Sequence, residues 1–195
     1  MKKPLTFLFL GRSGCGKGTQ AELLQQALEE RDGIGSVLYI YTGKKIRHLS
    51  EKDFYTSKIT KEIMKSGKLL PAFMAIWAWS DELIKKITPD VHVIFDGSPR
   101  LLNEAKIMDE VCNFYKRKET TVPILIDISR EEAERRLLTR GRLDDKKEAI
   151  EERLDFYNEH VQPTVDYYKN KGLITINGEQ SIEKVFEDLK KTIGL

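Results

Sequence analysis

Five short apolar runs constrain the fold of this 195-residue chain more than any other feature. They read LTFLFL, VLYIY, VHVIFD, VPILIDI and LITIN, at residues 5–10, 37–41, 91–96, 122–128 and 173–177. The first four do not alternate polar with apolar residues, which is typical of strands buried on both faces of a parallel sheet. The stretches between them, such as AELLQQALEE and EEAERRLLTR, have the spacing of amphipathic helices. This alternation predicts an α/β fold with a five-stranded parallel sheet flanked by helices, in one domain covering residues 1–195.

Two helical regions depart from a simple strand–helix rhythm. Residues 42–90 separate the second run from the third and are too many for a single crossover helix. Gly67 and Pro71 break this stretch, so we expect residues 42–71 to form a small helical insertion on the rim of the sheet. The second region covers residues 144–170, where Pro163 predicts a kink or a division into two helices.

Composition excludes several classes of protein. Lys plus Arg number 33 and Asp plus Glu number 31, a near balance that gives no reason to expect a nucleic-acid or membrane partner. Cys15 and Cys112 are the only cysteines, too few for a disulfide scaffold or a zinc ribbon. The apolar run at residues 5–10 is too short for a signal sequence or a membrane span. We therefore expect a cytoplasmic protein without a targeting segment.

The first apolar run leads directly into a glycine-rich stretch, GRSGCGKGTQ. Glycines at 11, 14 and 16 allow backbone dihedrals that other residues avoid, so backbone N–H groups can converge on a phosphate at a helix N-terminus. Lys17 would reach the β- and γ-phosphates of a nucleotide. An ordinary tight turn is the alternative, but strand, loop, lysine and amphipathic helix occur in the order that a phosphate-binding loop requires. Gly18 is unusual, because Ser or Thr normally follows the lysine of such loops.

The loop and the motifs after it resemble those of the adenylate kinase family of nucleoside monophosphate kinases, which are P-loop kinases. In that family Gly-Thr follows the lysine, as Gly18 and Thr19 do here, because the magnesium ion is held largely through water and carboxylates. The matching motifs continue as YTGKKIR at 41–47, GKLLP at 67–71, DGSPR at 96–100, RLLTR at 136–140 and RLDD at 142–145, followed by Arg153. The resemblance spans residue 7 to about residue 178, nearly the whole chain.

This resemblance implies transfer of a phosphoryl group from ATP to AMP, ATP + AMP ⇌ 2 ADP, with Mg²⁺ as the cofactor. The implied catalytic residues are Lys17, Arg100, Arg140, Arg142 and Arg153. The residues implied for ATP are Gly11, Ser13, Gly14, Cys15, Gly16, Lys17, Gly18, Thr19, Arg136 and Arg140. Those implied for AMP are Thr42, Gly43, Arg47, Lys68, Leu70, Gly97, Arg100, Glu104, Arg142 and Arg153.

The chemistry of phosphoryl transfer accounts for these residue types. The reaction needs positioning and neutralisation of negative charge, and the planar guanidinium of arginine binds phosphate oxygens in pairs. Asp96 ends the third run at the carboxyl edge of the sheet, where it could orient magnesium-bound water. Arginines on helices are more often exposed or ion-paired, and we expect Arg135, which faces away from Arg136 and Arg140, to be so.

Ser13 stands where the loop of the family usually has proline, and three positions after the loop also depart from the family pattern. Lys44 replaces an aspartate, and Ser98 replaces an aromatic residue. Glu104 replaces a glutamine that reads the acceptor base, and an ionised carboxylate can only accept hydrogen bonds. It would suit the amino group of adenine but repel its ring N1, whereas a guanine edge offers two donors. Thr42 is typical of the adenylate kinases, so AMP is the expected acceptor, and UMP, CMP or another monophosphate is the alternative.

The expected lid is minimal. Only GRL separates Arg140 from Asp144, so residues 140–145 would form the whole lid, with no room for a zinc site. Asp144 and Asp145 could also serve as an N-cap and first turn of the following helix. The family is commonly monomeric, and we expect a monomer. A nucleotide-binding switch without efficient transfer is the alternative from another class, against which the full set of arginines argues.

Overall fold

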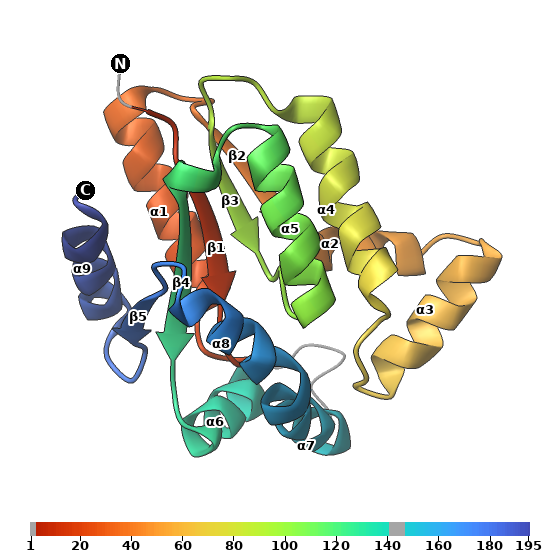
Figure 1. Cartoon of the computed structure of the whole chain (residues 1–195). Helices are drawn as coiled ribbons and strands as arrows, with labels where there is room; N and C mark the ends of the chain where they lie inside the picture. Colours follow the sequence, from red (N-terminus) through yellow and green to blue (C-terminus); the bar gives the residue numbers. More distant parts are fainter. Residues whose placement is uncertain (1–2, 141–146) are drawn as a thin grey trace.

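A computed structural model describes residues 3–140 and 147–195. Its centre is a five-stranded sheet in which all neighbours are parallel and the order is β2-β3-β1-β4-β5 (Figure 1). The strands are β1 (Thr6–Leu10), β2 (Val37–Tyr41), β3 (His92–Asp96), β4 (Thr121–Asp127) and β5 (Ile174–Asn177). The predicted α/β fold with a five-stranded parallel sheet flanked by helices is therefore confirmed.

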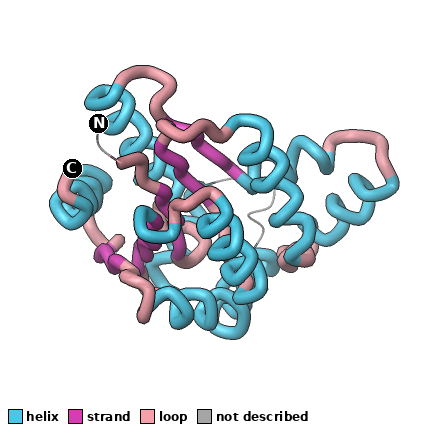
Figure 2. The backbone as a smooth tube through the Cα atoms, turned by 45° about the horizontal axis from the view of Figure 1, so that its top comes forward, coloured by secondary structure: helices cyan, strands magenta, loops and turns pink. Residues whose placement is uncertain are grey.

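Each face of the sheet carries its own hydrophobic core, because successive strand residues point to opposite faces. Phe7 and Phe9 pack into one core with α1 (Lys17–Asp32) and α9 (Ile182–Ile193). Leu8 and Leu10 pack into the other core with α4 (Ala72–Lys86), α5 (Leu102–Phe114) and α8 (Gln162–Lys169). Helices thus lie on both sides of the strands (Figure 2), which is why the first four runs do not alternate polar with apolar residues.

The segment between β2 and α4 contains two helices, α2 (Thr42–Ser50) and α3 (Tyr55–Lys65). Figure 1 shows α3 as the element farthest from the sheet on that side. Gly67, at φ 76°, lies just beyond the end of α3, and Pro71 is the N-cap of α4. Both predicted breaks therefore mark the ends of helices.

The region that contains Pro163 is divided, as predicted. α6 (Arg130–Arg140) precedes it, and α7 (Lys147–Phe156) is followed by a π-helical turn, Tyr157–Val161. Pro163 lies in the first turn of α8, directly after this π-helical turn, where the missing N–H of proline interrupts the regular α-helical hydrogen bonding. Within residues 3–140 and 147–195, no helix is long and apolar enough to cross a membrane.

Candidate active site

The glycine-rich loop joins the end of β1 to the start of α1 at the carboxyl edge of the sheet. Gly11, Gly14 and Gly16 have φ values of 135°, 84° and 95°, in the range that favours glycine. Gly16 is the N-cap of α1. The predicted need for unusual dihedrals at all three positions is confirmed.

Lys17 folds back across this loop. Its Nζ donates hydrogen bonds to the carbonyl oxygens of Gly11, at 2.8 Å, and Arg12, at 2.7 Å. It also lies 3.4 Å from the Sγ of Cys15, which is buried. The loop therefore holds the ammonium group of Lys17, the first residue of α1, against its own carbonyl oxygens.

Asp96 explains the glycine after the lysine. A Cβ atom at Gly18 would lie 3.2 Å from Oδ2 of Asp96, closer than nine in ten such contacts. The same oxygen accepts a hydrogen bond from the hydroxyl of Tyr39 at 3.2 Å. Burial, together with the Asp96 carboxylate, raises the pKa of Tyr39. Gly18 thus lets the Asp96 carboxylate, which is 5% exposed, approach the first turn of α1.

The loop forms one wall of a cavity, here called the loop cavity. Arg136 on α6 forms part of it, with Nη2 donating to the carbonyl of Gly178 at 2.8 Å and Nε donating to Glu132 at 2.6 Å. Arg135 pairs with the same Glu132 but is 67% exposed and is absent from the walls of both cavities, as predicted. The predicted ATP residues that line the loop cavity are Ser13, Gly14, Cys15, Gly16, Lys17, Gly18, Thr19, Arg136 and Arg140.

Gly11 does not line the loop cavity. A Cβ there would lie 2.5 Å from the carbonyl oxygen of Ile126 in β4, so this glycine serves the close approach of two backbones. One wall of the loop cavity was not predicted, and it consists of Gly178, Gln180, Ser181 and Ile182. These residues follow β5 at the carboxyl edge, and that position was the only signal that could have indicated them.

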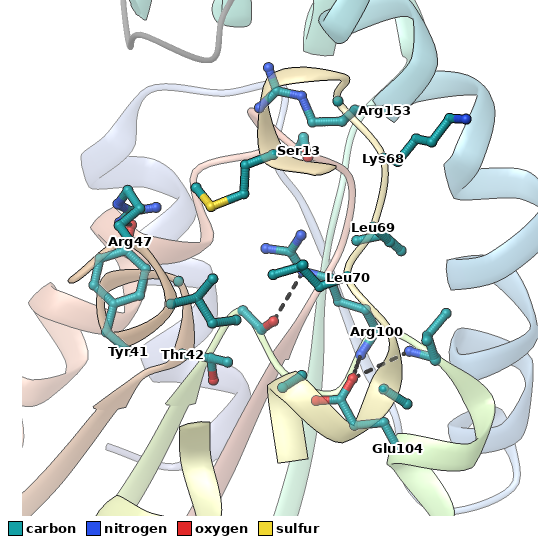
Figure 3. A pocket seen from close by; sticks show the side chains of 18 of the residues that line it. Ser13, Tyr41, Thr42, Arg47, Lys68, Leu69, Leu70, Arg100, Glu104 and Arg153 are labelled. Atoms are coloured by element: carbon teal, nitrogen blue, oxygen red, sulfur yellow. Dashed lines mark hydrogen bonds between the residues drawn. The ribbon is translucent and has the colours of Figure 1, made fainter. Parts of the chain in front are cut away.

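A second cavity lies against the helical insertion and is here called the insertion cavity (Figure 3). Arg47 on α2 reaches into it, donating to the hydroxyl of Tyr41 at 2.7 Å. The predicted AMP residues that line it are Thr42, Gly43, Arg47, Lys68, Leu70, Gly97, Arg100, Glu104 and Arg153. Tyr41, Ile46 and Met64 line it too and were not predicted.

Glu104 is 1% exposed, on the first turn of α5. Its Oε2 accepts a hydrogen bond from the backbone N–H of Arg100 at 2.8 Å, and its Oε1 accepts one from the indole of Trp79 at 3.2 Å. Burial raises the pKa of Glu104, and the backbone hydrogen bond from Arg100 acts in the opposite direction. Both carboxylate oxygens therefore already have protein donors at the edge of the insertion cavity.

The two cavities meet. Five residues line both of them: Ser13, Tyr41, Gly97, Arg100 and Arg140. A third, smaller cavity beside them is lined by Lys17, Arg100 and Arg153, among others. The structure thus gathers four of the five predicted catalytic cations around one junction, which suits neutralisation of phosphate charge.

Some predicted residues lie outside the described part of the chain. These are Arg142, Asp144 and Asp145, so of the expected lid at 140–145 only Arg140 is described. Among residues 3–140 and 147–195, no three His, Cys, Asp or Glu side chains are close enough together to hold a metal ion.

Comparisons with known proteins agree with this geometry. A family model described as adenylate kinase matches residues 9–173. The chain is 36% identical over 190 residues to an adenylate kinase of Azobacteroides pseudotrichonymphae genomovar. CFP2, covering 94% of each chain. It is 35% identical over 201 residues to one of Prochlorococcus marinus (strain AS9601), covering 100% of both. An adenylate kinase of Parabacteroides distasonis is 32% identical over 197 residues, with 97% of this chain and 98% of that one covered. The chain therefore belongs to the adenylate kinase family of phosphotransferases.

Proposed function

We propose that this enzyme transfers the γ-phosphoryl group of Mg·ATP directly to AMP, ATP + AMP ⇌ 2 ADP. The observation that carries the proposal is the junction between the cavities, where Arg100 and Arg140 belong to both walls. ATP would bind in the loop cavity with its phosphates on the glycine loop and its base beside Arg136. AMP would bind in the insertion cavity, with its phosphate toward the junction.

At the junction, a phosphate oxygen of AMP would attack the γ-phosphorus, and the bond from that phosphorus to the bridging oxygen of ADP would break. Such a transfer needs little covalent help, because its transition state is stabilised by positioning and by cations around the equatorial oxygens. We assign that role to Lys17, Arg100, Arg140, Arg142 and Arg153.

On the acceptor side, Arg47 and Arg100 would hold the phosphate of AMP. Thr42 lies in the same wall, and its buried Oγ1 has no hydrogen-bond partner among the described residues. A buried hydroxyl without a partner is costly, so it is well suited to a polar edge of the ligand. The other residues proposed for AMP are Gly43, Lys68, Leu70, Gly97, Glu104, Arg142 and Arg153.

On the donor side, the residues proposed for ATP are those predicted: Gly11, Ser13, Gly14, Cys15, Gly16, Lys17, Gly18, Thr19, Arg136 and Arg140. Asp96 lines the loop cavity beside Gly18 and Thr19. Its carboxylate is a hard oxygen donor of the kind that magnesium prefers, and it fits an ion held through water. When bound with ATP, Mg²⁺ would neutralise phosphate charge, and Asp96 would orient its water shell.

The remaining assignments are part of the same proposal. Residues 42–71 would form the acceptor-binding insertion, and residues 140–145 would form a minimal lid. The two cysteines lie in different hydrophobic cores, which supports an enzyme without zinc. Both are free thiols, which supports a reducing cytoplasm, and we propose a monomer without nucleic-acid or membrane partners.

The test measures ADP production from Mg·ATP with AMP, dAMP, GMP, UMP and CMP at equal concentrations. We expect turnover with AMP to exceed turnover with the other acceptors, and Lys17→Met to abolish it without unfolding the protein. Lys191→Met, an exposed position on α9, is the matched control and should keep full turnover. Faster turnover with another acceptor would contradict the assignment of AMP. Tight ATP binding without transfer to any of them would identify a nucleotide-binding switch instead.

A further inference from the structure

Trp79 and Glu104 form a buried pair whose partners are 25 residues apart in sequence. Trp79, on α4, is 0% exposed, and its ring packs edge-on against Phe95 of β3 with centroids 5.9 Å apart. Its Nε1–H donates to Oε1 of Glu104 at 3.2 Å. The indole therefore presents a fixed hydrogen-bond donor to one oxygen of the carboxylate.

The other oxygen of Glu104 holds the backbone that carries Arg100. Oε2 accepts from the N–H of Arg100 at 2.8 Å and lies 3.5 Å from the N–H of Leu101 (Figure 3). From the other side, Thr164 on α8 donates to the carbonyl oxygen of Arg100 at 2.8 Å. The guanidinium is then directed by a hydrogen bond of 3.0 Å from Nε to the carbonyl of Gly97. Arg100 is thus fixed at both its backbone and its side chain.

We propose that Trp79 and Glu104 act together as positioning residues that fix Arg100 at the junction of the two cavities. We also propose that the indole N–H of Trp79 selects a carboxylate over an amide at position 104. Both statements rest on the function proposed above. Neither side chain need touch the reacting atoms for this role. The pair acts through the backbone of residues 97–101, which joins β3 to α5.

The selection follows from counting donors and acceptors. Each oxygen of Glu104 accepts from an N–H group, so the position requires two acceptors. The buried Ser98 hydroxyl also faces this carboxylate, but a hydroxyl can donate or accept and does not change that requirement. A glutamine has one acceptor oxygen and one donor NH₂ group. In one orientation its NH₂ would oppose the indole N–H of Trp79, and in the other it would oppose the backbone N–H of Arg100. A buried donor that opposes another donor is left unsatisfied, which is costly.

This arithmetic makes the effect of one substitution depend on the other. Trp79→Phe keeps an aromatic ring against Phe95 but removes the indole N–H. In that background the glutamine can turn its NH₂ toward the vacated side and its oxygen toward Arg100. Glu104→Gln should therefore be harmful with Trp79 present and much less so with phenylalanine.

The experiment compares the wild-type enzyme, Glu104→Gln, Trp79→Phe and the double variant, with kcat and KM for ATP and AMP measured for each. We expect Glu104→Gln to lower kcat about tenfold, a change of roughly 1.4 kcal/mol. KM for ATP should stay within about twofold, because ATP contacts lie mostly in the loop cavity. The double variant should recover at least threefold in kcat over Glu104→Gln. Thermal unfolding separates loss of folded protein from loss of positioning.

An indole resonance gives a readout that is independent of activity. The chain has only two tryptophans, and Trp77 is 40% exposed, so it is an internal reference in ¹⁵N-labelled protein. The indole N–H signal of Trp79 should move in Glu104→Gln while that of Trp77 stays in place. Both oxygens of Glu104 are taken by protein donors, so its effect on AMP passes through Arg100, which would hold the AMP phosphate. AMP affinity measured by calorimetry should therefore weaken in parallel.

Two results would overturn the proposal: wild-type kcat in Glu104→Gln, or losses in the double variant that are the product of the single losses. Failure of the proposed function would give a different result, namely a wild-type enzyme that is inactive with every monophosphate. Even then, comparing the Trp79 indole signal in the wild-type protein and in Glu104→Gln would test the pair. In that case, an unmoved signal and an unchanged AMP affinity would reject the pair as well.

Discussion

Two glycines of the phosphate-binding loop should respond very differently to the same substitution. Gly11 and Gly16 both have positive φ, 135° and 95°, so alanine at either position enters a region that costs about 1–2 kcal/mol. At Gly16 an added Cβ would meet nothing within 4 Å. At Gly11 it would lie 2.5 Å from the carbonyl oxygen of Ile126 and 2.8 Å from the Sγ of Cys15.

The contact with Ile126 is the decisive one, because its oxygen cannot move easily. Ile126 is 0% exposed and lies within β4, which pairs with β1 on one side and with β5 on the other. Overpacking of this kind costs about 1–3 kcal/mol beyond the dihedral strain. Gly11→Ala should therefore lower the free energy of unfolding by about 2–5 kcal/mol, against about 1–2 kcal/mol for Gly16→Ala.

Chemical and thermal unfolding measure this difference. For a chain of this size, each kcal/mol corresponds to about 2–4 °C in Tm, so Gly11→Ala should melt at least about 2 °C below Gly16→Ala. Gly172→Ala is the control outside the loop, since Gly172 has φ 78° and open space around it. It should match Gly16→Ala. Equal losses at Gly11 and Gly16 would refute the claim that β4 packs against the loop through backbone contact.

Three further outcomes follow from the site and the core. Gly18→Ala should leave Tm within a few degrees of the wild-type value. It should reduce kcat about 10–100-fold, because the new Cβ would displace Asp96. Unchanged turnover across a magnesium titration would contradict this. Arg136→Ala should raise KM for ATP about tenfold, or roughly 1.4 kcal/mol, whereas Arg135→Ala should not change it, and equal effects would show the helix face to be misassigned. Burial lowers the pKa of His92 in the folded protein. As pH falls below about 6.5, the unfolded chain therefore takes up a proton at His92 before the folded protein does. The free energy of unfolding should then fall by up to about 1.4 kcal/mol per pH unit. His92→Asn should flatten this part of the stability curve measured by urea unfolding, and an unchanged slope would refute the assignment.

The fold was predictable because its signals are local. β1 and β3 are buried on both faces, and burial of that kind favours mainly apolar residues without alternation. β5, at the edge of the sheet, is only partly buried, and its sequence alternates accordingly. Pro71 and Pro163 marked the starts of α4 and α8, since proline is tolerated in the first turn and disrupts the interior.

The contacts within the site were not predictable in the same way, because they join residues distant in sequence. Nothing in the sequence near Tyr39 indicates that its hydroxyl donates to Asp96 on the neighbouring strand β3. Glu104 was predicted as a site residue from its motif, and it lines the insertion cavity. Its partner Trp79 was not, because the hydrogen bond between them depends on how α4 packs against α5.

A single-turnover experiment with ATP radiolabelled in the γ-phosphoryl group tests whether this group passes from ATP to AMP. The enzyme, in excess over labelled ATP and with unlabelled AMP and Mg²⁺ present, should move the label into ADP with little release as inorganic phosphate. Direct transfer requires this, because the loop cavity and the insertion cavity meet at Arg100 and Arg140. Lys17→Met should leave the label in ATP. Label released mainly as inorganic phosphate, or retained in ATP by the wild-type enzyme, would contradict the account.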